Sequence, residues 1–141
     1  MTQEDKDLLL KDLSARLSYG VMLNIEDIAD TYNDKFFSIS FNHGDCLYIN
    51  GLCVDNNGYD SYATIKPYLF PLSSMTEEQR YNNPIGFSQM LTILANRDWE
   101  YVTIKHKDLQ KLIDWFNKNH FDYRGLIGKG LAIDATSKNI Y

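Results

Sequence analysis

The clearest helical pattern of the chain lies near its C-terminal end. Apolar residues recur there at the i, i+3, i+4, i+7 spacing of one helix face, and charged residues occupy the opposite face. Asn119 marks the predicted end of this helix. The apolar face consists of Leu109, Leu112, Ile113 and Phe116, and the charged face of Lys107, Lys111, Asp114 and Lys118. This pattern predicts an amphipathic helix that packs on the core.

A second helix is predicted from about Gln3 to Leu17. Thr2 is placed to cap it, acidic residues crowd its first turn, and Gly20 lies just beyond its end. Its predicted core stripe is Leu9, Leu13 and Leu17, widened by Leu10.

Residues 19–66 change to the period-two pattern of strands. A polar, acidic loop over Glu26–Lys35 is predicted to follow the first of them. In the second, alternation places Phe37, Ile39 and Phe41 on one face. The predicted strands are Tyr19–Ile25, Phe36–Phe41, Cys46–Ile49 and Tyr62–Lys66.

Two dipeptides within this region signal tight turns. Asn50-Gly51 and Asn57-Gly58 both have the residues of a type I′ hairpin, although Gly51 could instead mark a bulge in one longer strand. Either arrangement gives an antiparallel β-meander, which we expect Pro67 and Pro71 to end.

The pattern after the prolines is helical again. Ser74–Glu77 has the form of a capping box with Ser74 as the cap. That helix is predicted to be short, because Asn83 and Pro84 restart a helix that runs to about Asn96. Trp99–Ile104 is predicted as a further strand. The stripe of the restarted helix is Phe87, Met90, Leu91 and Leu94.

The segment Phe121–Ile133 is unusually apolar for a surface tail. Gly125, Gly128 and Gly130 permit tight bends in it. We therefore expect this tail to fold back onto the core. No linker or repeat divides the chain, so residues 1–141 are predicted to form one α+β domain: an N-terminal helix, an antiparallel β-meander that could curl into a small half-barrel, and C-terminal helices.

The composition favours a globular protein. The chain has 141 residues, 44% of them hydrophobic, and no apolar run approaches a membrane span. Its acidic start does not resemble a signal peptide, so we expect a soluble, cytoplasmic protein with no membrane contact. Cys46 and Cys53 would lie on opposite faces of a single strand, which disfavours a disulfide, and we interpret them as apolar fillers.

Charge is distributed unevenly. The net charge is −5, with a local balance of −7 over residues 1–60 and of +2 over residues 97–129. An acidic protein is disfavoured as a general nucleic-acid binder. The basic C-terminal third nevertheless leaves a nucleic-acid-associated accessory role as an alternative. Against it, Asp114 is spaced to pair with Lys111 and Lys118 on the same helix.

Three segments carry a resemblance to known sequences. They are Asp12–Leu17, Ile65–Glu78, and His120–Ile127 followed by Gly130–Ala132, and together they cover about a quarter of the chain. In order and placement they resemble a family of small proteins, without known activity, encoded by gut bacteria of the Bacteroides type and by their phages and prophages. The resemblance implies a phage or mobile-element origin. It implies no activity and no site residue.

No motif for catalysis, cofactor binding or metal binding is present. His43, His106 and His120 lie in different predicted elements without metal-ligand spacing, and His120 is placed to bond the last carbonyls of its helix. The turn at Asp55–Asp60 lacks the ligand positions of a calcium loop. We therefore expect no catalytic residue, no cofactor and no metal.

The surplus of tyrosine is the feature that points to function. Ten tyrosines exceed what one core of this size can hold, and exposed Tyr and Trp are favoured at protein interfaces. Trp115 lies at the margin of the C-terminal helix stripe. The candidate interface is therefore Trp115, Tyr123 and Arg124. We expect a non-enzymatic binding or assembly protein that acts through a protein partner or self-association.

Overall fold

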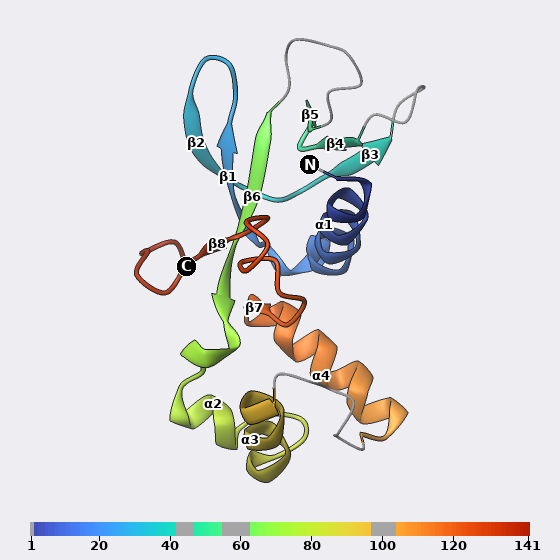
Figure 1. The fold of residues 1–141 in the computed structure, drawn as a ribbon, viewed down its shortest axis with the longest axis vertical. Coiled ribbons are helices and arrows are strands. Elements are labelled where there is room, and N and C mark those ends of the chain that lie inside the picture. The colour runs from blue at the N-terminus through green and yellow to red at the C-terminus, as the bar shows by residue number, and fades with distance from the viewer. Residues whose placement is uncertain (1, 42–46, 55–62, 97–103) are drawn as a thin grey trace.

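The computed structural model of the chain describes residues 2–41, 47–54, 63–96 and 104–141. Helix α1 and the β-sheets occupy one end of an elongated molecule, and helices α2, α3 and α4 occupy the other (Figure 1). Strand β6 runs from the first end toward the second. The α+β class, the N-terminal helix, the antiparallel strands and the C-terminal helices are confirmed.

Helix α1 spans Gln3–Arg16, close to its predicted bounds. Thr2 caps it through a capping box, in which its hydroxyl accepts from the Asp5 amide at 3.1 Å. The placement of Leu17 in the core stripe is wrong: its side chain is 43% exposed. The reason is that the chain tightens there into the 3₁₀ turn η1 (Leu17–Tyr19), which ends at Gly20 with a φ of +66°.

The first sheet is built around β1 (Met22–Glu26). It pairs antiparallel with β2 (Thr31–Lys35) on one side and with β6 (Thr64–Pro71) on the other. The prediction of a polar loop at 26–35 is wrong for residues 31–35. They form an edge strand whose side chains face water. Because this strand is held by backbone hydrogen bonds to β1, its sequence shows no alternation of apolar residues.

The prediction that Pro67 ends the sheet is also wrong. Pro67 lies inside β6, opposite Leu23, and the strand continues to Pro71. The Met22 amide faces β6, and the backbone groups of the next residue, Leu23, face the other side. Leu23 and Pro67 therefore form a pair that exchanges no ladder hydrogen bonds. Proline is tolerated there because it has no N–H to donate.

A second, three-stranded sheet lies between β2 and β6 in the sequence. It consists of β3 (Ile39–Phe41), β4 (Leu47–Ile49) and β5 (Leu52–Cys53), so the predicted single meander is divided between two sheets. The β4–β5 turn is the predicted hairpin, with φ of +51° at Asn50 and +80° at Gly51. These two positive angles match a type I′ turn rather than a bulge.

The alternation predicted for residues 36–41 is wrong at its start. Phe36 is buried, whereas Phe37 is 63% exposed. The Phe36 amide still donates to the Val21 carbonyl and so extends the β1–β2 ladder, while β3 begins only at Ile39.

The helical end begins with η2 (Leu72–Ser74), followed by α2 (Glu77–Tyr81), α3 (Phe87–Asn96) and α4 (His106–Lys118). The capping box of α2 is Thr76 with Gln79, not the one predicted from Ser74, which donates to the Pro71 carbonyl inside η2. Helix α3 begins three residues later than predicted, because the Asn83 side chain closes a turn onto the Ile85 amide instead of capping a helix at Pro84.

Helix α4 matches its prediction. Leu112 and Phe116 are buried, Leu109 and Ile113 are half-buried, and Asn119 is the C-cap. The tail that follows docks as predicted: β7 (Phe121–Asp122) and β8 (Ile133–Asp134) both pair parallel with β6.

The buried residues form two clusters. The sheet core gathers α1, the strands and the tail around residues such as Leu13, Ile25 and Leu126. The helix core gathers η2, α3 and α4 around Met90, Leu112 and Phe116. The predicted turn at Asn57-Gly58, the predicted strand at residues 99–103, His43 and Cys46 lie outside the described residues.

Candidate functional site

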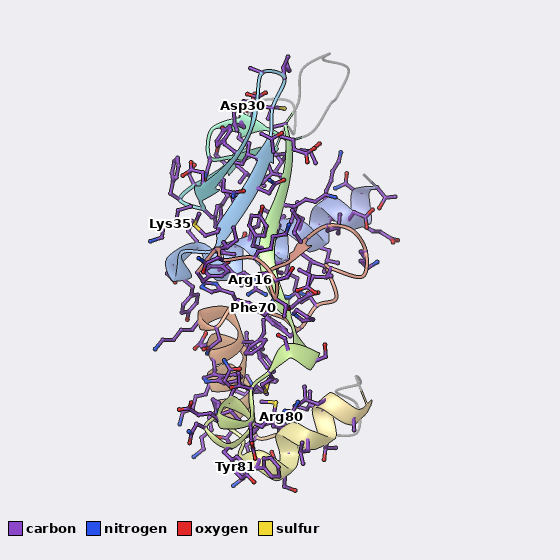
Figure 2. The ribbon with its side chains drawn as sticks, turned by 90° about the vertical axis from the view of Figure 1, so that its left-hand side faces the viewer. Arg16, Asp30, Lys35, Phe70, Arg80 and Tyr81 are labelled. Atoms are coloured by element: carbon purple, nitrogen blue, oxygen red, sulfur yellow. The ribbon has the colours of Figure 1, made fainter. Side chains whose placement is uncertain are left out.

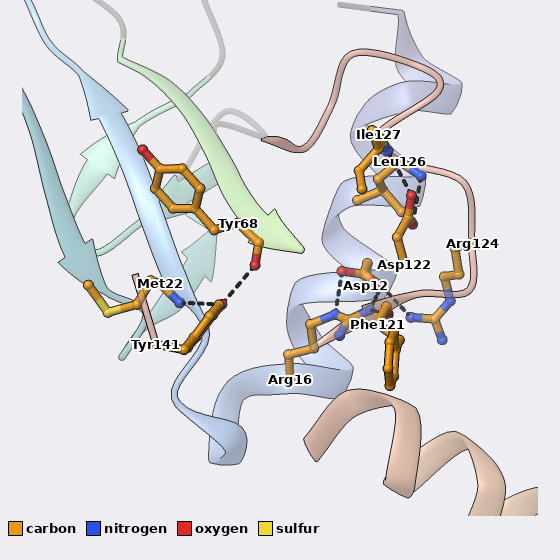
Figure 3. A network of polar contacts seen from close by, with 10 residues as sticks. All are labelled: Asp12, Arg16, Met22, Tyr68, Phe121, Asp122, Arg124, Leu126, Ile127 and Tyr141. Carbon is orange, nitrogen blue, oxygen red and sulfur yellow. Dashed lines mark hydrogen bonds and ion pairs between the residues drawn. The ribbon is translucent and has the colours of Figure 1, made fainter. Parts of the chain in front are cut away.

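A buried ionic network joins the two ends of the molecule. Asp12 on α1 accepts from Arg16 Nε at 2.7 Å and from Arg124 Nη1 at 3.1 Å. Arg16 also donates from Nη2 to the Phe121 carbonyl at 2.7 Å (Figure 3). Asp12 and Arg16 are both fully buried. We call these four residues, Asp12, Arg16, Phe121 and Arg124, the junction. Phe121 also belongs to the helix core.

One predicted interface residue, Arg124, belongs to this network, and a second, Tyr123, packs against it. Arg124 lies over the Tyr123 ring at 4.6 Å, and the Tyr123 ring stacks on Phe116 with centroids 5.4 Å apart. Burial raises the pKa of the Tyr123 phenol. The contacts of these residues are largely internal.

Trp115 is half-buried on the helix core. Its ring stacks on Phe121 and meets Phe116 at a tilt, each with centroids 5.6 Å apart. Trp115, Tyr123 and Arg124 do not form an open patch: they pack around the point where α4 turns into the tail.

A cavity of about 550 Å³ lies beside this turn. Its walls come from the end of β6 and η2, from α2 and α3, and from the tail, so all the elements of the helical end except α4 line it together with the tail. Tyr123 is the one predicted interface residue that reaches it. The lining residues are Pro71, Leu72, Ser73, Arg80, Ile93, Leu94, Asp122, Tyr123, Gly125, Ile127 and Gly128.

Arg80 and Asp122 supply the charges of this cavity. The Asp122 carboxylate accepts from the Leu126 amide at 2.8 Å and from the Ile127 amide at 2.9 Å, which shapes the tail into its bend (Figure 3). Arg80 projects from α2 at the helical end (Figure 2). Its Nε is buried, and its guanidinium has no hydrogen bond or ion pair within the part of the chain that the structure describes.

His120 and Tyr141 form a second polar contact at the junction. Their rings stack with centroids 4.0 Å apart. The Tyr141 hydroxyl accepts from the Met22 amide and donates to the Tyr68 carbonyl, so it replaces a ladder bond between β1 and β6 (Figure 3). Burial, together with the nearby Arg16 charge, lowers the pKa of His120 to about 4, and burial raises that of Tyr141 to about 12.

Helix α3 presents apolar groups outward as well as inward. Met90 and Ile93 are buried in the helix core, whereas Leu91 is 38% exposed. Phe87 lies one turn before Leu91 and stacks on Tyr81 at 4.1 Å, and Tyr81 is 56% exposed. None of the ten residues of α3 is charged. We call Tyr81, Phe87 and Leu91 the outer face of α3.

Other predicted chemistry stays dispersed. His106 is exposed at the start of α4, and Cys53 is half-buried on β5. Over residues 2–41, 47–54, 63–96 and 104–141, no cluster of metal-ligating side chains occurs, and no helix is long and apolar enough to cross a membrane. The expected pairing of Asp114 with Lys111 and Lys118 is wrong: in the described part of α4 these lysines form no ion pair.

Comparison with protein-family models, with curated proteins and with solved structures found no match. Neither Arg80 nor the outer face of α3 was predicted from the sequence. The spacing of Phe87 and Leu91 was visible, but it was assigned to the core because a stripe alone does not tell which face is covered.

Proposed function

We propose that this chain is a non-enzymatic binding or assembly protein that acts in the cytoplasm through a protein interface on the outer face of α3. The exposure of Leu91 on a helix without charged residues carries this proposal. Exposed apolar patches mark sites of protein interaction. The phage or mobile-element origin is part of the proposal and rests on the resemblance of the three segments described above.

The stack of Tyr81 on Phe87 supports this surface. Aromatic residues are enriched at interfaces because they bury much area with little loss of conformational freedom. Because a two-fold interface uses the same patch on both subunits, a second copy of the chain is the first partner to test.

The test is the oligomeric state by light scattering. The parent should self-associate at concentrations up to ~100 μM, and Leu91→Glu should abolish this by placing a charge in the interface. Ile28→Glu is the matched control, because Ile28 is 74% exposed at the β1–β2 turn and lies outside the proposed surface. Loss of association in both variants, or a parent that stays monomeric, contradicts self-association through α3.

A heterologous partner is tested by site-specific crosslinking. A photoreactive residue at position 91 should capture one defined protein in cells, and the same residue at position 28 should not.

We retain Trp115, Tyr123 and Arg124 as a proposed margin of the interface, since Tyr123 and Leu94 of α3 line one cavity. Arg124→Gln should then weaken binding of the partner while the structure of the outer face of α3 stays unchanged.

One observation favours a nucleic-acid-associated role as the second candidate. Lys107, Lys111 and Lys118 are exposed on α4 and form no ion pair in the described residues. The net charge of −5 opposes it. Titration of labelled single- and double-stranded DNA at ~150 mM salt should show little binding below ~10 μM. Tight, salt-sensitive binding that Lys111→Glu abolishes would replace the protein-interface proposal with this one.

A further inference from the structure

We infer that the cavity beside the junction binds a small organic monocarboxylate, with the acid group on Arg80 and an apolar body against η2, α3 and the tail. This goes beyond the protein interface proposed above, because it assigns a small-molecule site to the cavity, which shares Tyr123 with the proposed margin but none of its lining with the outer face of α3. The juxtaposition that carries it is a single cation, without a partner among the described residues, in a cavity whose lining is mainly apolar.

Arg80 defines the polar end of the ligand. Its Nε is buried and has no acceptor among the described residues, and none of its nitrogens is paired there with a carboxylate. A buried cationic donor without an acceptor is costly, and a planar carboxylate satisfies two guanidinium N–H groups at once. An anion bound in the cavity would therefore supply the contact that the fold leaves open.

The walls define the body of the ligand. Leu72, Ile93, Leu94 and Ile127 contribute aliphatic side chains, and Pro71 adds a ring. A volume of about 550 Å³ is in the range of pockets that enclose small molecules. The ligand is thus larger than an inorganic anion and has an apolar portion of several carbons.

Asp122 limits the charge of the ligand. Its carboxylate lies in the same lining, where it accepts from two amides, so a bound anion would lie near a second carboxylate. With one cation and one carboxylate in the described lining, the cavity suits a ligand with a single negative charge. A dianion such as phosphate would meet repulsion from Asp122 with no further cation in the described lining to offset it.

The experiment is an NMR titration of the intact chain with 4-phenylbutyrate. The acid should shift the amides of Gly125 and Gly128 and the Nε resonance of Arg80. The neutral analogue 4-phenylbutanol and inorganic phosphate should each bind at least ~10-fold more weakly, since a charge-assisted contact contributes about this factor.

Two variants separate the site from the general charge of the protein. Arg80→Gln should weaken 4-phenylbutyrate ~10-fold or more, with its spectrum showing an intact fold. Lys107→Gln removes the same charge from α4 and should leave binding unchanged. Equal binding of the alcohol, equal binding of phosphate, unchanged binding in Arg80→Gln, or no shift at ~20 mM acid would each overturn the proposal. Leu91→Glu should bind the acid normally, so failure here and failure of the α3 interface are distinguishable.

Discussion

Asp12 is the residue on which most of the buried charge converges. Two arginines donate to it, one of them fully buried and the other 17% exposed. Removing the shared carboxylate leaves Arg16 buried with only the Phe121 carbonyl as its described acceptor. Removing Asp12 and removing Arg124 therefore provide a pair of tests on the same ionic network.

Asp12→Ala should destabilise the fold by ~3–5 kcal/mol, because it leaves an uncompensated buried charge. Arg124→Gln should cost no more than ~1 kcal/mol, as expected for a partly exposed ion pair. Urea unfolding followed by circular dichroism measures both. Equal losses in the two variants would show that the burial of Arg16 does not matter.

His120 is expected to make stability depend on pH. Its pKa in the fold is about 4, below the ordinary value of 6.5, so the unfolded chain binds the extra proton first. The contribution of neutral His120 is therefore complete above about 6.5 and is lost as the pH falls toward 4. The nearby Arg16 charge opposes protonation in the same direction.

His120→Asn is the matched variant, because His120 has a φ of +59° and Asn tolerates that backbone conformation. Its stability should change less between pH 6.5 and 4.5 than that of the parent. The comparison uses the slope of stability against pH, since loss of the Tyr141 stack lowers the absolute value in the variant. Parallel slopes would exclude His120 as the source.

At the scale of elements, α4 is the helix whose packing should contribute most to the stability of the fold. Leu112 is fully buried in the helix core, and Leu→Ala at such sites costs ~2–5 kcal/mol. Leu109→Ala, at a half-buried position one turn earlier, is the control and should cost less. If the melting temperature of Leu112→Ala stayed within a degree or two of that of the parent, α4 would not be a core element.

Elements with strong local signals were predictable. The stripes and caps of α1 and α4 depend on neighbours within one or two turns, and the Asn50-Gly51 turn depends on two residues with positive φ. These are properties that a local pattern records.

The missed elements depend on distant partners. Strand β2 is polar and exists because β1 offers it a ladder, and β7 and β8 are two-residue strands defined only by pairing with β6. The same holds for the candidate sites. No local pattern tells that Arg80 of α2 meets the tail in one cavity, or that α3 leaves Leu91 uncovered.

At the scale of the whole molecule, two hydrophobic cores share one strand and one ionic network. We predict that they unfold together, since β6 contributes Ile65 and Leu69 to the sheet core and packs Phe70 against the helix core. In a Trp99→Phe background, Trp115 fluorescence reports the helix core. NMR peaks of Leu23 and Ile25 report the sheet core.

The urea midpoints from these two probes should coincide. A sheet core that melts at a different urea concentration from the helix core would divide the chain into two independent units. If the two transitions separate in Asp12→Ala, the junction is what couples the two cores.

The junction can form only after the ribosome has synthesised both α1 and the tail. Arg16 and the Phe121 carbonyl are 105 residues apart, and Asp12 and Arg124 are 112 apart. Because translation adds about 5–20 residues per second, on the order of ten seconds separate the appearance of α1 from that of its partners in the tail. Throughout that interval Leu9 and Leu13 have no tail to cover them, and a nascent chain with such a stripe is a substrate for chaperones. Helix α1 is therefore synthesised well before the tail that completes its packing.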